Sequence, residues 1–348
     1  MNTSMSAAGT RSRLSLRLQA WQRVFFPVLA IVVCTATLFV VTLGPVSAAQ
    51  WPLLEHSAAS AVTAQSVSDF SAAVRRTSRG SIEIGPAPAG AKVTADRLLS
   101  DLSAGRIDLA RVSLATLEAF DPVVALDRVP YLATNFIDAA KLWQVLQPYV
   151  RDVLKSKGVT LLYAVPQPPR SPLSRKPMIR LSGWRGSTLV MGAPALTGFA
   201  RAVGAIPAAD GKVRELLKDG RADVVFESAS SAVRDKAWEF ATDFLQASAW
   251  FPKELVLANS RKLADLTAAE RDALFLAADV AGREAWSLAA RSTEDSVQML
   301  RDYGIKTHET PVNVLIQLET LGRDLLFQWS GAAGESGAKL VEAYYAIR

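Results

Sequence analysis

The segment "TAAERDALFLAADVAGREAWSLAARSTEDSVQMLRDYG", residues 267–304, predicts the longest helix of the chain. Thr267 and Glu270 form a capping-box pattern at its start, and Gly304 ends it. At 1.5 Å per residue, an unbroken helix of this length measures about 55 Å, which exceeds the diameter of one lobe. We therefore expect the helix to lie across two lobes, with Gly282 as a candidate kink position.

Upstream of this helix, helical and strand patterns alternate. Strands are predicted at Ile82–Ile84, at Asp108–Val112 and within residues 158–167, 186–192, 212–228 and 250–260. Such alternation is typical of an α/β protein with mixed sheets. The predicted organisation has lobe I over 49–165 with part of 304–348, lobe II over 166–250 with the crossing strand 250–260, the long helix over 266–303, and a C-terminal helical segment over 304–348.

Residues 1–48 have the pattern of a secretory signal peptide. Four arginines and no acids accompany an apolar stretch from Phe25 to about Val46, and small residues precede Ala49. An uncleaved membrane anchor is the alternative, since the apolar run approaches the length that spans a bilayer. Removal of the four arginines lowers the formal net charge from +6 to +2. So small a charge gives no reason to propose nucleic-acid binding.

The sequence predicts no catalytic group, metal site or cofactor. Cys34 lies inside the apolar segment, and His56 and His308 lie far apart in unrelated contexts. These residues provide no ligand set for zinc and no thiol for the exported part of the chain. No phosphate-binding, dinucleotide-binding or nucleophile-elbow motif occurs. We therefore expect a binding protein rather than an enzyme.

One basic segment, "PQPPRSPLSRKP" at residues 166–177, carries Arg170, Arg175 and Lys176 in a rigid, proline-rich crossing. A fixed guanidinium suits an anionic ligand, because its planar fork pairs with a carboxylate through two hydrogen bonds. A basic surface loop is the alternative interpretation.

The order of several motifs resembles the extracytoplasmic solute receptors of TRAP transporters, the family typified by the C4-dicarboxylate-binding periplasmic protein. The similar segments are "DFSAAVRRTSRGSIEIGPAPAG" (69–90), "LLSDLSAGRIDLARVS" (98–113), "PVVALDRVPYL" (122–132), "RSPLSRKPMIRLSGWRGSTLV" (170–190), "VGAIP" (203–207) and "LLKDGRADVVFES" (216–228). The resemblance implies a two-lobed α/β periplasmic binding protein of type II-like fold, with mixed sheets, a hinge cleft and a long helix that spans both lobes.

Two departures from the family pattern bear on the ligand. The resemblance places Val190 where the family has its usual ligand-anchoring arginine, and Phe226 where it has an acid. Arg170 matches a second family arginine and could hold an anion alone. The predicted ligand-binding residues are Arg170, Val190, Met191, Tyr131, Phe226, Glu227 and Trp250, with a core position as the alternative for Trp250.

The resemblance also implies a role. We expect a monomeric periplasmic receptor that closes its lobes over a small organic molecule, anionic or partly apolar, and delivers it to TRAP-type permease subunits. The alternative is a sensor partner or a diverged interaction protein on the same fold, tethered to the membrane by its N-terminus.

Overall fold

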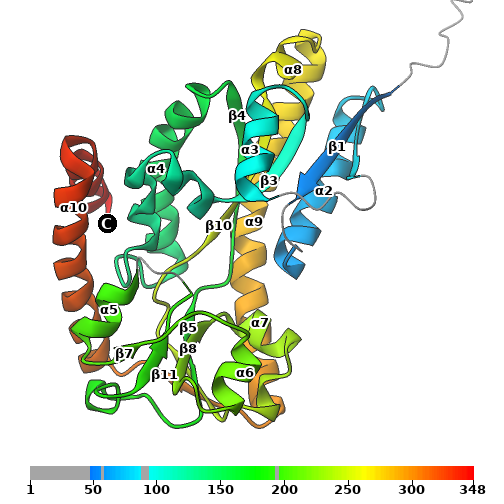
Figure 1. Ribbon diagram of the computed structural model, residues 1–348. Helices are drawn as coiled ribbons and strands as arrows, with labels where there is room; N and C mark the ends of the chain where they lie inside the picture. The colour runs from blue at the N-terminus through cyan, green and yellow to red at the C-terminus, as the bar shows by residue number, and fades with distance from the viewer. Residues whose placement is uncertain (1–47, 56–58, 88–93, 193–195) are drawn as a thin grey trace, which may run out of the picture. The chain divides into compact units, whose positions relative to one another are not determined.

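The computed structural model describes residues 48–55, 59–87, 94–192 and 196–348, which form two mixed α/β lobes (Figure 1). The predicted signal peptide, Cys34 and His56 lie outside the described residues, except for Ala48. No helix in the described ranges is both long and apolar enough to cross a bilayer.

The first lobe is built on a five-stranded sheet with the order β2-β1-β3-β10-β4. β1 pairs in parallel with β2 and β3, whereas β10 runs antiparallel to β3 and β4. The strands are β1 (Ala49–Glu55), β2 (Ile82–Pro86), β3 (Leu109–Ser113), β4 (Val159–Pro166) and β10 (Lys253–Asn259).

The position of β10 corrects the organisation predicted from sequence, which grouped residues 250–260 with lobe II. Leu255 of β10 lies opposite both Val112 of β3 and Ala164 of β4, inside the first sheet. Leu255 and Val256 belong to different hydrophobic clusters, because successive side chains of β10 are buried on opposite faces of the sheet. A strand covered on both faces belongs at the centre of a sheet.

Helices cover both faces of the first sheet. α2 and α9 share one hydrophobic cluster with β1 and β4, while α3 and α4 pack with β3 and β10 on the other face. The helical segments of this lobe are α2 (Ala61–Thr77), α3 (Ala95–Ser103), α4 (Phe136–Lys155), α8 (Ser260–Ala264) and the 3-10 helices η1 (Leu114–Ala119) and η2 (Pro122–Arg128).

The second lobe has a six-stranded sheet with the order β11-β9-β5-β8-β6-β7. Its strands are β5 (Ser171–Ser174), β6 (Thr188–Val190), β7 (Ile206–Pro207), β8 (Val224–Glu227), β9 (Asp243–Gln246) and β11 (Lys306–Glu309). Its helical segments are η3 (Leu181–Gly183), α5 (Thr197–Ala202), α6 (Val213–Lys218), α7 (Ala229–Arg234) and η5 (Ala237–Glu239). β6 pairs in parallel with both β7 and β8, so its end lies beside the end of β8.

The expected long helix is α9 (Ala268–Asp302), and it joins the lobes. The capping box is present, because the Glu270 amide donates to the Thr267 hydroxyl and the Glu270 carboxylate accepts from the Thr267 amide. α9 contacts α2 and β4 in the first lobe and α7 and β11 in the second. Gly282 lies within the continuous helix rather than at a kink, and a Cβ there would come within 3.2 Å of the Tyr163 side chain.

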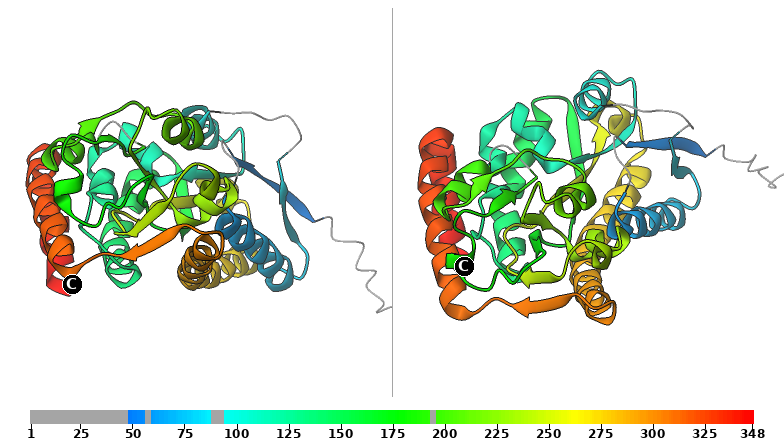
Figure 2. Two further views of the ribbon diagram at one scale, coloured as in Figure 1. Left: turned by 90° about the horizontal axis from the view of Figure 1, so that it is seen from below. Right: turned by 60° about the horizontal axis from the view of Figure 1, so that its bottom comes forward.

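The last element, α10 (Val312–Ile347), also packs against both lobes, on a different side from α9 (Figures 1 and 2). Val314 and Leu318 belong to a cluster of the second lobe, whereas Leu326 and Tyr344 pack with residues of η2 and α4 in the first. Gly334, with φ of 64°, breaks the helix.

Candidate ligand-binding site

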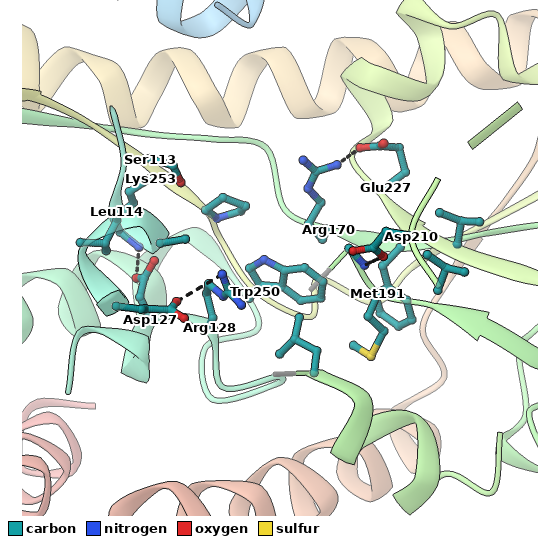
Figure 3. Close-up of a pocket in the computed structure, with 18 of the residues that line it drawn as sticks. Ser113, Leu114, Asp127, Arg128, Arg170, Met191, Asp210, Glu227, Trp250 and Lys253 are labelled. Atoms are coloured by element: carbon teal, nitrogen blue, oxygen red, sulfur yellow. Dashed lines mark hydrogen bonds and ion pairs between the residues drawn. The ribbon is translucent and has the colours of Figure 1, made fainter. Parts of the chain in front are cut away.

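A cavity of about 380 Å³ lies where residues of the two lobes face each other (Figure 3). The first lobe contributes Ser113 to Ala115, parts of η1 and η2, and the start of β10. The second contributes the ends of β6 and β8, together with Arg170, Leu196, Asp210 and Trp250. Its volume is suited to a small organic molecule.

Arg170 and Trp250 are held together at the two segments that cross between the lobes. The Arg170 amide donates to the Trp250 carbonyl at 3.0 Å, and the Ala249 amide donates to the Arg170 carbonyl at 2.8 Å. This isolated antiparallel bridge fixes the backbone beneath both side chains. The Arg170 guanidinium and the Trp250 indole are therefore positioned by the lobe connections themselves.

The Arg170 guanidinium forms an ion pair with the Glu227 carboxylate (Figure 3). Glu227 ends β8, is mostly buried, and also accepts a hydrogen bond from the Ser228 amide at 2.8 Å. Burial lowers the pKa of Arg170, and the nearby positive charge of Arg234 acts in the same direction. Glu227 therefore supplies the negative charge that this guanidinium needs in the absence of a ligand.

A second ion pair joins Lys253 at the start of β10 to Asp127 of η2, and both side chains are buried. Lys253 also donates to the Phe251 carbonyl at 3.1 Å and lies 5.8 Å from the ring centres of Trp143 and Trp286. Burial raises the pKa of Asp127, while Lys253 acts to lower it. The pair fixes η2 against β10 at the first-lobe side of the cavity.

The third cation of the lining, Arg128, lies 3.2 Å from Glu118. Each of the three lining cations thus faces a lining carboxylate. Asp210 is the fourth acid. Its carboxylate accepts from the Gly192 amide at 3.1 Å, and no described cation pairs with it. The lining therefore has one more negative than positive side chain.

The remaining wall is apolar. The rings of Phe226 and Trp250 stack with centres 5.8 Å apart and planes inclined by 18°. Val190 and Met191, at the end of β6, lie beside them and are almost fully buried. A flat or cyclic ligand carbon skeleton could pack against this surface.

Of the seven ligand-binding residues predicted from sequence, six line the cavity: Arg170, Val190, Met191, Phe226, Glu227 and Trp250. Trp250 lines the cavity and is also part of the second-lobe core, so its two interpretations are compatible. Arg175 and Lys176 are exposed and lie outside the cavity lining.

Tyr131 is a core residue rather than part of the cavity, which corrects its prediction. Its side chain is 1% exposed, and its ring lies 5.2 Å from the Phe199 ring. Its amide donates to the Ala249 carbonyl at 2.7 Å. Tyr131 therefore packs in the second-lobe core with residues of α5 and α10, and its side chain does not line the cavity.

Sequence reasoning missed the charged residues that the first lobe contributes, above all Asp127, Arg128 and Lys253. A signal was present, because each interrupts an apolar run, in "VVALDRVPYL" and "WFPKELVLA". Charged side chains within buried runs are normally paired. The sequence does not show which acid pairs with which base.

His308, one of the two histidines considered in the sequence analysis, lies outside the cavity lining. His308 lies 2.8 Å from the Asp243 carboxylate, within the pairing of β11 and β9. Among the described residues, no cluster of three or more His, Cys, Asp or Glu side chains could hold a metal ion.

The model of the family described as bacterial extracellular solute-binding protein, family 7, matches residues 55–320. The chain belongs to this family. Its members are solute-binding receptors rather than an enzyme class, they act outside the cytoplasm, and they work with membrane permease subunits. No curated protein sequence matches the chain.

Solved structures of the family share the fold. DctP6 of Bordetella pertussis, an extracytoplasmic solute receptor binding pyroglutamic acid, is 25% identical with a TM-score of 0.77, over 86% of this chain and 100% of that one. DctP7 of the same organism, which also binds pyroglutamic acid, is 24% identical with a TM-score of 0.76, over 86% and 100%. The ectoine-binding protein of the Halomonas elongata TeaABC TRAP transporter is 15% identical with a TM-score of 0.73, over 86% and 98%.

Proposed function

We propose that this TRAP-type receptor binds, between its two lobes, a small organic molecule that carries one carboxylate and one N–H donor. In this proposal the mature chain is a periplasmic monomer that closes around the ligand by a hinge motion. The observation that carries the proposal is the Arg170–Glu227 ion pair, in which one cation and one acid are available side by side.

Arg170 is the anchor for the ligand carboxylate. A guanidinium has five donors, so it can keep contact with Glu227 while it donates to a second carboxylate. Glu227 then needs a donor of its own, because sharing Arg170 weakens the ion pair between them. A ligand N–H group beside the carboxylate supplies that donor.

A dicarboxylate does not fit the same lining. Its second carboxylate would add a further acid to a lining that already has four acids and three cations, and the cations other than Arg170 already face Glu118 and Asp127. The position that the resemblance assigns to the family's anchoring arginine holds Val190 instead. Burial of a carboxylate without a charge partner costs several kcal/mol, about the scale of the whole affinity of a weak ligand.

The receptor DctP6 supports this ligand class. It is 25% identical to this chain and binds pyroglutamic acid, a five-membered lactam with one carboxylate and one ring N–H. The stacked rings of Phe226 and Trp250 provide a flat wall for such a ring. Pyroglutamate is therefore the first probe that we choose.

Four probes of similar size separate the chemical requirements in a thermal unfolding assay. Pyroglutamate has both groups. The lactone 5-oxotetrahydrofuran-2-carboxylate lacks the N–H, pyroglutamide lacks the charge, and glutarate has two carboxylates. We expect pyroglutamate to raise the Tm by about 5 °C or more at a concentration about 100 times its Kd, because it binds only the folded chain. We expect the other three to raise the Tm less.

The Arg170→Met variant is the control for the site, because it removes the anchor and leaves the Val190, Met191 and Trp250 wall in place. It should lose the response to pyroglutamate. A larger Tm rise with glutarate than with pyroglutamate would show that the cavity holds a dicarboxylate and that the charge argument is wrong.

A further inference from the structure

A second hollow lies on the second lobe, between η3, the end of α5 and the first half of α10. We call it the arginine groove, because Arg180, Arg185 and Arg201 line it. Its volume is about 1090 Å³, and it shares no lining residue with the ligand cavity. It is therefore a separate feature of the surface.

The charges of the arginine groove are unbalanced. All three arginines are exposed, no Asp or Glu lines the groove, and no described carboxylate pairs with any of the three. Arg323, one turn along α10, adds a further cation whose guanidinium donates to Thr320 of the lining at 3.1 Å. Asp324 lies one turn beyond Thr320 on α10 and outside the lining.

The ligand cavity and the arginine groove differ in how their charges are paired. In the cavity, each of the three cations faces an acid of the same lining. In the arginine groove, by comparison, like charges share a concave surface without any neutralising group. Such an arrangement attracts anions and gives an incoming acidic partner a favourable potential.

The lining also distinguishes a peptide from a simple anion. Leu181, Val314 and Leu321 give the groove apolar patches, while Asn313 and Gln317 offer amides that can bond to a peptide backbone. Ile316 directly precedes the lining residue Gln317 on α10, and Ile206 follows the lining residue Gly204 by two positions. These isoleucines are 56% and 57% exposed, respectively. Mixed apolar and hydrogen-bonding surface with basic residues is typical of a protein interface.

We propose that the arginine groove docks an acidic segment of a permease subunit. The groove lies partly on α10, which also packs against the first lobe, so a bound segment would contact the helix that touches both lobes. This inference goes beyond the proposed ligand and does not depend on which molecule the cavity binds.

The test uses the full receptor and TRAP-type permease subunits from the same genome, reconstituted in nanodiscs that contain phosphatidylglycerol. The charge-reversal variant R180E/R185E/R201E is compared with the natural receptor by biolayer interferometry at about 50 and about 200 mM NaCl. We expect the natural receptor to bind more weakly at the higher salt concentration. We expect the variant to lose about tenfold or more in affinity at the lower one.

The matched control is R151E/R261E/R291E, which reverses three exposed arginines that no described carboxylate pairs with. It changes the net charge equally and should bind the permease within about threefold of the natural receptor. Equal losses in both triple variants would overturn the proposal. Equal binding to nanodiscs without permease would also overturn it, because lipid headgroups would then be the partner.

Failure of this proposal is distinguishable from failure of the ligand proposal. The R180E/R185E/R201E variant should retain the thermal response to pyroglutamate, since none of its substitutions lies in the ligand cavity. Thermal unfolding in the absence of ligand shows whether the variant remains folded.

Discussion

At the scale of single residues, the main property of the cavity is the pairing of each lining cation with a lining carboxylate. Lys253 and Asp127 illustrate this best, because both are buried and each is the other's charge partner. An ion pair of this kind is costly to break, since removal of one member leaves a buried, unpaired charge. Substitution of one member of this pair therefore tests whether the cavity lining is charge-paired as described.

We predict that Lys253→Met lowers the free energy of unfolding by about 3–5 kcal/mol at about pH 7.5 and by less at about pH 5, as measured by urea denaturation. Burial raises the pKa of Asp127, and Lys253 is the main group that opposes this. Without Lys253, the folded state holds the proton at pH values where the unfolded chain has released it. Stability is therefore lost as pH rises above the ordinary Asp range.

Lys262→Met is the matched control for this prediction. The Lys262 ammonium is partly exposed and lies 3.9 Å from Asp108, so its removal should cost less than about 1 kcal/mol at either pH. If Lys253→Met were equally destabilising at both pH values, ionisation of a buried Asp127 would not be the cause.

Prediction from sequence was uneven at this scale. Arg170 could be found because a cation in a proline-rich crossing is conspicuous, and Val190 and Phe226 because they depart from a family pattern. Lys253 and Asp127 are 126 positions apart, and only the fold brings them together. Tyr131 was misplaced because sequence pattern does not distinguish an aromatic wall from an aromatic core.

At the scale of elements, the close approach of α10 to the first lobe depends on one glycine. A Cβ at Gly322 would lie 2.4 Å from the Pro130 carbonyl oxygen and 3.3 Å from the Tyr131 side chain. Tyr131 itself has φ of 60°, a left-handed conformation that a non-glycine residue adopts only under constraint. The contact with Gly322 is part of that constraint.

We predict that Gly322→Ala destabilises the chain by about 1–3 kcal/mol, because the helix or the loop must move to admit the methyl group. Gly331→Ala is the control on the same helix. No atom lies within 4 Å of its added Cβ, so the higher helix propensity of alanine should stabilise the chain by up to about 1 kcal/mol. Thermal unfolding followed by circular dichroism measures both. A stabilising Gly322→Ala would contradict the close packing.

Elements with strong local signals were predictable. The capping box and the extent predicted for the long helix both match α9. The short strands β5, β9 and β11 were not predicted, because each has only four residues and depends on its neighbours in the second sheet. β10 was recognised as a strand, but its place in the first sheet depends on pairing over long sequence separations.

At the scale of the whole molecule, function depends on the two lobes meeting at the cavity. α9 and α10 each contact both lobes, and the Arg170–Trp250 bridge joins the crossing segments beside the cavity. The sequence could predict two lobes and a helix between them. It could not predict that the guanidinium of Arg170 would face Glu227, which follows it by 57 positions in the chain and on which the proposed ligand chemistry rests.

The central claim is that one ligand binds both residues, with its carboxylate on Arg170 and its N–H group on Glu227. Isothermal titration of pyroglutamate and its lactone analogue, against the natural chain and Glu227→Gln, tests it most directly. We predict that the natural chain prefers the lactam by about 10- to 100-fold, since the lactone leaves the Glu227 carboxylate facing a ring oxygen. In Glu227→Gln the preference should fall below about threefold, because the amide can accept from the N–H or donate to the ring oxygen. Equal affinity of the natural chain for both probes, or an unchanged preference in the variant, would contradict the account.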